Sequence, residues 1–219
     1  MSKYVIKFKR GDRVKYISHL DFVRMFHRSV RRSGLNFEFS QGFNPHPIMT
    51  VAVPLSVGVT ADGEYMMVGF NTDLSEKEIM DTLNNSLPDG FSVSNVKIQD
   101  GKKYDFNLID YAEYIIDAES ENPDLLDLDA LLSGNLVVTK KTKSGEKETD
   151  IRPLIHSVER VDSVSGNLGL RMIIRAGNRE TLKPETVISA INKYQEKVNI
   201  GFFSSHRKAL LTDKLKELL

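Results

Sequence analysis

Three side chains in the N-terminal part of the chain could together carry out acid–base chemistry: Tyr16, His19 and His46. His19 follows Ser18, a residue type that caps helices, and the unpaired N–H groups of a helix N-terminus attract anions. A histidine placed there could exchange a proton with an RNA 2′-hydroxyl, as a metal-independent endoribonuclease of the ferredoxin-like type would require. Because this idea rests on architectural analogy, it stays an alternative, with these three residues as its catalytic candidates.

A second group of polar side chains lies in the stretch FSQGFNPHP, residues 39–47. Gly42 can adopt positive φ, and each proline fixes its own φ while holding the preceding residue extended. The stretch is therefore stiff, and it either serves only as a bulge between strands or presents side chains to a ligand or an RNA base edge. The side chains that it could present are Gln41, Phe43, Asn44 and His46.

A row of arginines follows His19. On a helix running from Ser18 to Ser33, Arg24, Arg28 and Arg31 fall within roughly 60° of one another, opposite the apolar side, with Arg32 beside them. A guanidinium binds phosphate in a bidentate manner, so the row could follow a nucleic-acid backbone. The alternative is a solvated face that is neutralised by acidic residues elsewhere in the chain.

Charge is unevenly distributed along the chain. Residues 1–60 carry ten basic and three acidic side chains, whereas residues 61–138 carry four basic and seventeen acidic ones. The two blocks would create opposed fields if each formed its own surface, and would cancel if they interleave. The acidic stretch 110–129 could instead dock a protein partner. Arg152 and Arg207 are candidates for a second basic patch, with ordinary surface positions as the alternative.

The composition excludes several classes of protein. The absence of cysteine rules out disulfides, iron–sulfur clusters, thiolate metal sites and a cysteine nucleophile. The five histidines have no ligand-type spacing, so we expect no metal and no cofactor. No stretch is long and apolar enough to span a bilayer, and the N-terminus has no signal-peptide core, so we expect a cytoplasmic protein.

The first half reads as strand, helix, strand, strand, helix, strand. The expected elements are 3–10, 18–33, 35–39 with 47–53, 63–70, 75–87 and 91–98. Two interleaved βαβ units of this kind give a four-stranded antiparallel sheet with both helices on one face. We therefore predict an α+β protein whose residues 1–100 form a ferredoxin-like domain carrying the basic helix and the GFNPHP loop.

The second half repeats this plan with an added hairpin. The expected elements are a strand at 108–119, a helix at 123–133, a hairpin over 136–155 turning at Ser144–Gly145, strands at 156–164 and 168–177, a helix at 184–194 and a final strand near 198–211. We predict that residues 107–219 form a second α+β domain, also ferredoxin-like with an antiparallel sheet.

Several motifs occur together and in order: SHLD at 18–21, the arginines after it, GFNPHP at 42–47, PLSVGV at 54–59 and the pair Gly63–Glu64. In these motifs the chain resembles the bacterial radical-SAM-linked proteins, a domain of unknown function found alone or fused behind radical SAM enzymes. The resemblance covers about residues 1–100 well and implies RNA-related or ribosome-related work beside a radical SAM protein. It supplies no catalytic residue.

The function expected from the sequence is that of an accessory protein that binds RNA or presents a substrate to a radical SAM enzyme acting on tRNA, rRNA or the ribosome. The alternatives are the endoribonuclease described above and a pure protein–protein adaptor. No membrane and no DNA are expected among its partners. The physical basis is that positive charge from the opening strand and the first helix gathers beside the proline-rich bend in a single pocket.

Overall fold

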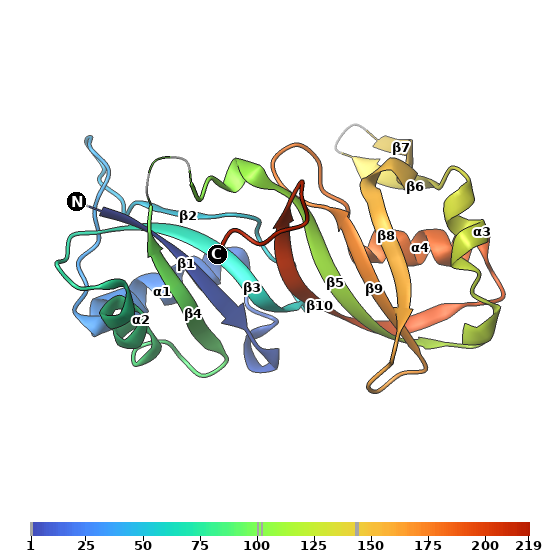
Figure 1. The fold of residues 1–219 in the computed structure, drawn as a ribbon, viewed down its shortest axis with the longest axis horizontal. Coiled ribbons are helices and arrows are strands. Elements are labelled where there is room, and N and C mark those ends of the chain that lie inside the picture. Colours follow the sequence, from blue (N-terminus) through green and yellow to red (C-terminus); the bar gives the residue numbers. More distant parts are fainter. Residues whose placement is uncertain (1, 100, 102, 143–144) are drawn as a thin grey trace. The chain divides into compact units, whose positions relative to one another are not determined.

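The structure, a computed structural model, describes residues 2–99, 101, 103–142 and 145–219 as a mixed α+β protein whose strand pairs are mostly antiparallel (Figure 1). Two compact units are present: Met1–Ile109 with Thr212–Leu219, and Asp110–Leu211. The sequence assigned all of 107–219 to the second domain. The C-terminal residues instead belong to the first unit, because Glu217 pairs there with Lys7.

The first unit contains two longer helices and a sheet. Its elements are β1 (Ser2–Arg10), the 3₁₀ turn Asp12–Val14, α1 (His19–Ser33), β2 (Met49–Val51), β3 (Thr60–Phe70), α2 (Glu76–Asn84), β4 (Phe91–Ile98) and the 3₁₀ turn Phe106–Leu108. The strand order is β4-β1-β3-β2, and each neighbouring pair is antiparallel. Both helices begin where the sequence predicts, since Ser18 and Ser75 accept capping bonds, and α1 ends as predicted at the left-handed Gly34. The helix predicted over 75–87 ends earlier, at Asn84.

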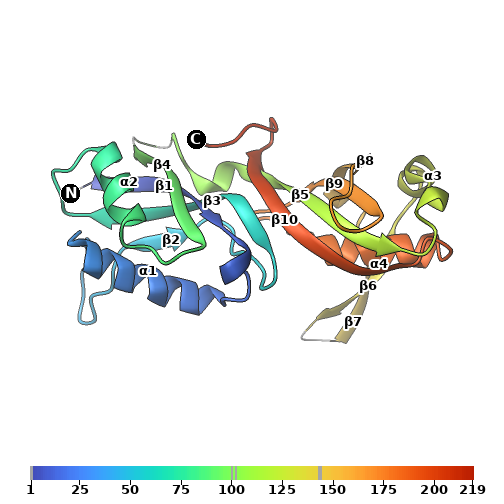
Figure 2. The ribbon, with the colours of Figure 1, turned by 90° about the horizontal axis from the view of Figure 1, so that it is seen from below.

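The core of the first unit lies between the sheet and its two helices. Side chains alternate along β1, so that Tyr4, Ile6 and Phe8 face α1 and α2. There they pack with Phe26 of α1 and Leu83 of α2, which are fully buried. Figure 2 shows α1 lying along the strands. Burial of these apolar side chains fixes α1 to the sheet by one side only, so its opposite side faces solvent.

The second unit holds the remaining elements. They are β5 (Ile109–Ser120), the 3₁₀ turn Pro123–Leu125, α3 (Leu128–Ser133), β6 (Val137–Thr142), β7 (Gly145–Asp150), the 3₁₀ turn Arg152–Leu154, β8 (Ile155–Val161), β9 (Leu168–Arg175), α4 (Pro184–Tyr194) and β10 (Ile200–Thr212). Here the strand order is β10-β5-β9-β8, while β6 and β7 pair as a separate hairpin. The helix α4 buries Val187, Ile188 and Ile191.

Two sequence predictions need correction. The helix predicted over 123–133 is split into a 3₁₀ turn and α3, because Leu126 is extended and the Asp127 carboxylate caps a new start by accepting from Ala130 N–H. The strand predicted at 35–39 reduces to isolated bridges of Phe37 and Phe39. The predicted turn at Ser144–Gly145 lies partly outside the described residues.

Candidate nucleic-acid interface

The solvent side of α1 is basic. Arg24, Arg28 and Arg31 are all exposed, whereas Phe22, Met25, Phe26 and Val30 are buried on the other side. The helix period thus places the three guanidiniums in one row, as the sequence predicts. Tyr16 and Leu20, which precede the arginine row in the sequence, are 74% and 65% exposed.

Little negative charge lies near this row. Asp21 accepts a hydrogen bond from the Ser18 hydroxyl and forms an ion pair with Arg24 at 3.2 Å. Both interactions lower the pKa of the Asp21 carboxyl. The Arg24 side chain is 68% exposed, so this pair holds it only weakly. Within the described residues, Arg28 and Arg31 form no ion pair. Asp21 is the one acidic residue of α1, so the arginine row is not neutralised by its own helix.

Arg32 lies off the row. Its guanidinium donates to the Ser86 carbonyl at 2.7 Å and to the Ser29 hydroxyl at 3.0 Å. These bonds join the end of α1 to the segment that follows α2. We therefore assign Arg32 a structural role, although the sequence grouped it with the other arginines.

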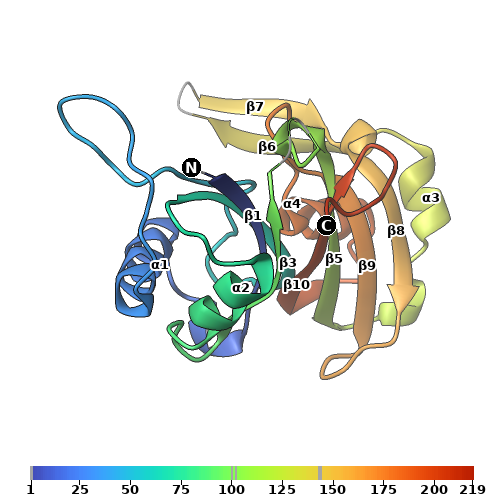
Figure 3. The ribbon, with the colours of Figure 1, turned by 60° about the vertical axis from the view of Figure 1, so that its left-hand side comes forward.

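Residues 39–47 form a projecting hairpin, which we call the finger (Figure 3). Phe39 pairs with Pro47, Ser40 N–H donates to the His46 carbonyl at 2.9 Å, and the Ser40 hydroxyl contacts His46 Nδ1 at 2.9 Å. Gly42 has φ 135°, a backbone conformation that disfavours other residues. The finger is therefore closed by its own bonds, as its proline and glycine content indicates.

The finger presents its side chains to solvent. Gln41, Asn44 and His46 are exposed, and Phe43 is 111% exposed, with no cover from the rest of the described chain. An aromatic ring in water is unfavourable unless a partner covers it, and it is the group on which an unpaired base stacks. The finger combines one such ring with three hydrogen-bonding side chains.

The base of the finger is anchored to the first unit beside α1. Glu38 N–H donates to the Gly69 carbonyl at 2.8 Å, and Gly69 N–H donates to Ile48 at 2.9 Å. The His27 ring of α1 contacts Phe37 edge-on, with centroids 5.2 Å apart. The finger thus rises from the sheet edge next to the flank of α1 that carries Arg31.

His27, on the flank of α1, is partly buried. Its Nε2 is buried and has no hydrogen-bond partner within the described residues. Burial lowers the pKa of the imidazole, and the nearby Arg31 acts in the same direction. The neutral imidazole ring therefore packs against Phe37, between α1 and the base of the finger.

Within the described residues no contact joins Tyr16, His19 and His46, the predicted acid–base cluster. His19 lines a small cavity with Val51, Leu55 and Glu64, at the N-terminal end of α1. The finger base sits at Gly69, five residues along β3 from Glu64, which is about 17 Å away on an extended strand. His46 lies further out along the finger. The described contacts of His46 are with Ser40 and Asn44 of the finger, and none is with His19.

Two buried charged residues at this cavity were not predicted as site residues. Arg10 is 4% exposed and donates to the carbonyls of Val14, Lys15 and Ile17, which builds the turn before α1. Glu64 is 2% exposed and lines the same cavity. The motifs SHLD, PLSVGV and Gly63–Glu64 thus meet at the start of α1. The sequence held a signal for Arg10, since it continues the buried alternation of Tyr4, Ile6 and Phe8.

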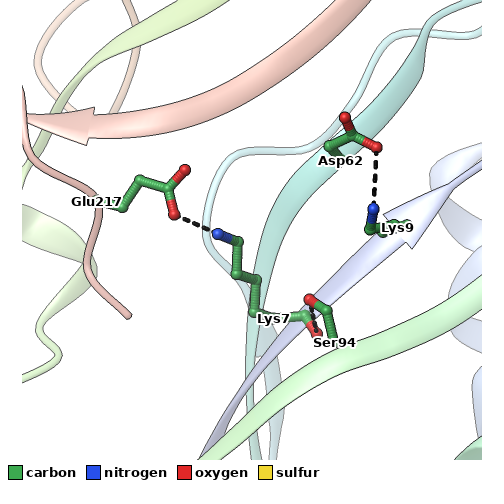
Figure 4. A network of polar contacts seen from close by, with 5 residues as sticks. All are labelled: Lys7, Lys9, Asp62, Ser94 and Glu217. Atoms are coloured by element: carbon green, nitrogen blue, oxygen red, sulfur yellow. Dashed lines mark hydrogen bonds and ion pairs between the residues drawn. The ribbon is translucent and has the colours of Figure 1, made fainter.

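The lysines of β1 do not join the arginine row, which corrects the prediction of a single basic pocket. They alternate with the side chains that face α1 and so project from the other face of the sheet. Lys7 pairs with Glu217, and Lys9 pairs with Asp62 at 3.4 Å (Figure 4). The basic surface at α1 is thus made by the arginines, without the strand.

In each unit, basic and acidic blocks of the sequence interleave. In the first unit Arg13 of the basic block pairs with Asp89 of the acidic block at 3.2 Å, and in the second Arg171 pairs with Glu113 of the acidic block at 2.7 Å. Arg175 pairs with Asp110 at 3.0 Å. Part of the negative charge of the stretch 110–129, at Asp110 and Glu113, is thus paired within its own unit.

Asp117, also in that stretch, has a structural role. Its carboxylate accepts hydrogen bonds from the hydroxyls of Ser163 and Ser165 and from the N–H groups of Val164, Ser165 and Gly166. These bonds strongly lower the pKa of Asp117. They hold the connection between β8 and β9 in one conformation.

The two arginines predicted for a second basic patch are held inside the second unit. Arg207 is 1% exposed and donates to the Tyr114 hydroxyl at 3.5 Å, so the expectation of a surface position is wrong. Arg152 is partly buried and donates to the carbonyls of Leu132 and Ile155 at 2.6 and 3.1 Å. Both guanidiniums are thus engaged within their own unit.

No group of three or more His, Asp or Glu side chains in the described residues is arranged to hold a metal ion. A search of the same residues for a helix able to cross a membrane finds none.

Comparison with known proteins places the chain in a family. Residues 3–184 match the profile of a family described as an uncharacterized protein conserved in bacteria (DUF2344). The chain belongs to this family. The DUF2344 match includes α1, the finger and most of the second unit, and it stops at the start of α4.

Two further comparisons add little. No curated protein matches the chain. Among solved structures, the chain is similar to an unknown protein from Galdieria sulphuraria, at 18% identity and a TM-score of 0.28, with 94% of this chain and 98% of that one covered. At this TM-score the likeness supports no argument about function.

Proposed function

We propose that this member of the DUF2344 family is a cytoplasmic accessory protein that binds single-stranded RNA and presents it to a modifying enzyme. The observation that carries the proposal is the arginine row Arg24, Arg28 and Arg31, exposed beside a stiff finger with a fully exposed Phe43. Arginines bind the phosphates, and the finger stacks on and hydrogen-bonds to unpaired bases.

Single-stranded RNA fits this surface better than a duplex. Sequence-specific RNA recognition uses bases that are splayed out and stacked on aromatic rings, and the finger offers one such ring with amide and imidazole groups around it. The common alternative on an open β-sheet is stacking on the helix-free face. That face carries Tyr65, which is fully buried, so α1 and the finger are the available elements.

The identity of the enzyme partner rests on resemblance. The motif order resembles the radical-SAM-linked proteins, so we propose a radical SAM protein acting on tRNA, rRNA or a ribosomal component as the partner. Since His19 and His46 lie apart, the arrangement gives no support to the endoribonuclease alternative.

We also propose that both units are variants of the ferredoxin-like fold. The support is the strand order: β4-β1-β3-β2 in the first unit and β10-β5-β9-β8 in the second, with helices between the corresponding strands. The hairpin of β6 and β7 would then be an insertion after α3.

The test is the salt dependence of RNA binding, measured by fluorescence anisotropy with a labelled single-stranded RNA. For single strands the slope of log affinity against log salt changes by about 0.7 for each phosphate contact. Replacing Arg24, Arg28 and Arg31 by alanine should therefore flatten the slope by about 2 and weaken binding at low salt.

A matched control removes the same charge elsewhere. Lys77, Lys183 and Lys197 are exposed, and their triple alanine variant loses three positive charges outside the α1 row. The proposal requires that this control keep most of the wild-type slope. Equal slopes for the two triple variants would mean that only net charge matters, and the α1 surface would lose its role.

A further inference from the structure

The face of the first unit's sheet that is turned away from α1 and α2 is covered by the segment Asp213–Leu219. Lys7 and Tyr65 are neighbours in register on β1 and β3 of this face. The Glu217 carboxylate pairs with the Lys7 ammonium, as Figure 4 shows. The backbone of Leu218 and Leu219 lies beside the Tyr65 phenol, which is fully buried.

One residue of this segment has an unfavourable backbone conformation. Leu215 has φ 56°, a left-handed conformation that is costly for a leucine. Tyr65 Oη is buried without a hydrogen bond of good geometry to any described residue, and burial raises the pKa of this phenol far above its usual value. This backbone cost favours displacement of the segment when a ligand competes for Lys7.

The surface beneath has the chemistry of an RNA platform. Lys3, Lys7 and Lys9 lie on one face of β1, with about 13 Å from Lys3 to Lys7 and about 7 Å from Lys7 to Lys9 along the strand. The Lys7 ammonium lies 5.9 Å from the centre of the Tyr65 ring. A sheet face with an aromatic ring next to cations is the arrangement on which single-stranded RNA stacks, with its phosphates on the cations.

We propose that residues 213–219 form a displaceable strap over a second site for single-stranded RNA, and that the Glu217 carboxylate occupies the position of a phosphate on Lys7. This inference rests on the proposed function for the class of ligand only. The strap would let the protein hold RNA on α1 and the finger first, and then bind a further stretch of the same strand when the strap leaves.

A reporter variant follows the strap directly. The chain contains no tryptophan, so Leu218→Trp creates a single one within the strap. We expect blue-shifted emission in the free protein and a red shift when a single-stranded oligouridine is added. The same red shift should occur in Glu217→Lys without RNA, and the charge exchange Lys7→Glu with Glu217→Lys should restore the blue-shifted emission.

Affinity supplies the second measurement. Glu217→Lys should bind the oligouridine about tenfold more tightly than the wild type, because Lys7 and Tyr65 become free. Asp213→Lys makes the same charge change at an exposed position of the strap and should change affinity much less. Adding Lys7→Gln to Glu217→Lys should remove most of the gain.

The outcomes separate this inference from the proposed function. If the gain from Glu217→Lys persists when Arg24, Arg28 and Arg31 are alanines, the strap site exists independently of α1. Equal affinities for Glu217→Lys and Asp213→Lys, or tryptophan emission that RNA leaves unchanged, would overturn the strap and leave the α1 surface untouched.

Discussion

Arg10 offers the sharpest test of how the fold builds the start of α1. Its buried guanidinium donates from Nε to the Val14 carbonyl at 3.2 Å and from Nη2 to the carbonyls of Lys15, at 2.7 Å, and Ile17. Arg10→Lys keeps the charge but has a single nitrogen at the end of a flexible stem. At least one or two of the three carbonyls then lose their donor.

The magnitude follows from the hydrogen bonds that are lost. A bond to a charged group contributes about 1.5–3 kcal/mol, so losing one to two of them should destabilise the protein by about 3 kcal/mol. For a chain of this size that corresponds to a fall in Tm of about 6–12 °C. Thermal unfolding followed by circular dichroism measures it.

Arg13→Lys is the matched control for this experiment. Arg13 lies three residues further on and pairs with Asp89 at 3.2 Å, but the two side chains are 78% and 89% exposed. An exposed pair contributes little, so we expect a change within about 0.5 kcal/mol. Equal effects of Arg10→Lys and Arg13→Lys would refute the assignment of Arg10 as the residue that organises the turn before α1.

Three further predictions concern other elements. Asp117→Ala should lower the free energy of unfolding in urea by about 2–3 kcal/mol at pH 7, because five donors of the β8–β9 connection lose their acceptor. The pKa of Asp117 in the folded state lies below the unfolded value of about 3.9, so this stabilisation is present above pH 4 and declines as pH falls toward the folded pKa. Asp162→Ala, in the same connection, is the control and should have little effect. The pKa of the His27 imidazole is lowered in the folded state, so the wild type should lose stability as pH falls from about 6.5. The stability of His27→Leu should depend less on pH over that range. Parallel curves of stability against pH for the two proteins would contradict the burial of a neutral ring. Gly69→Ala would place a Cβ atom 2.9 Å from Glu38 Cβ and should destabilise the protein by about 1–3 kcal/mol. Denaturant unfolding measures this change, and faster amide exchange at the finger base should accompany it. Gly134→Ala is the control, because the space around its Cβ is open.

The regular elements could largely be predicted from the sequence, because their signals are local. The serine caps and the glycine stop delimit α1, and the two-residue alternation of Tyr4, Ile6 and Phe8 predicts β1. The arginine row follows from the same helical period. The prediction of one continuous helix over 123–133 was wrong, because the Asp127 side chain caps a new helix start within that segment.

The assembly of the site depends on tertiary contacts that a local pattern does not contain. The distance between His19 and the finger follows from the direction of β3 and the length of α1. Arg207 looks like a surface residue within SSHRKA, yet it shares its strand face with Ser205 and Ala209, which are buried. The two-residue alternation of buried positions along this long strand could have indicated that Arg207 is buried, but a charged side chain is normally expected at the surface.

The most direct measurement for the central claim is a map of RNA contacts on the whole protein. A single-stranded RNA containing 4-thiouridine would be crosslinked to the wild-type chain, and the modified residues identified by mass spectrometry. We predict crosslinks at the finger, above all at Phe43, and on the exposed side of α1 between Leu20 and Arg31. Crosslinks confined to Asp110–Leu211, or none under conditions in which control RNA-binding proteins react, would contradict it.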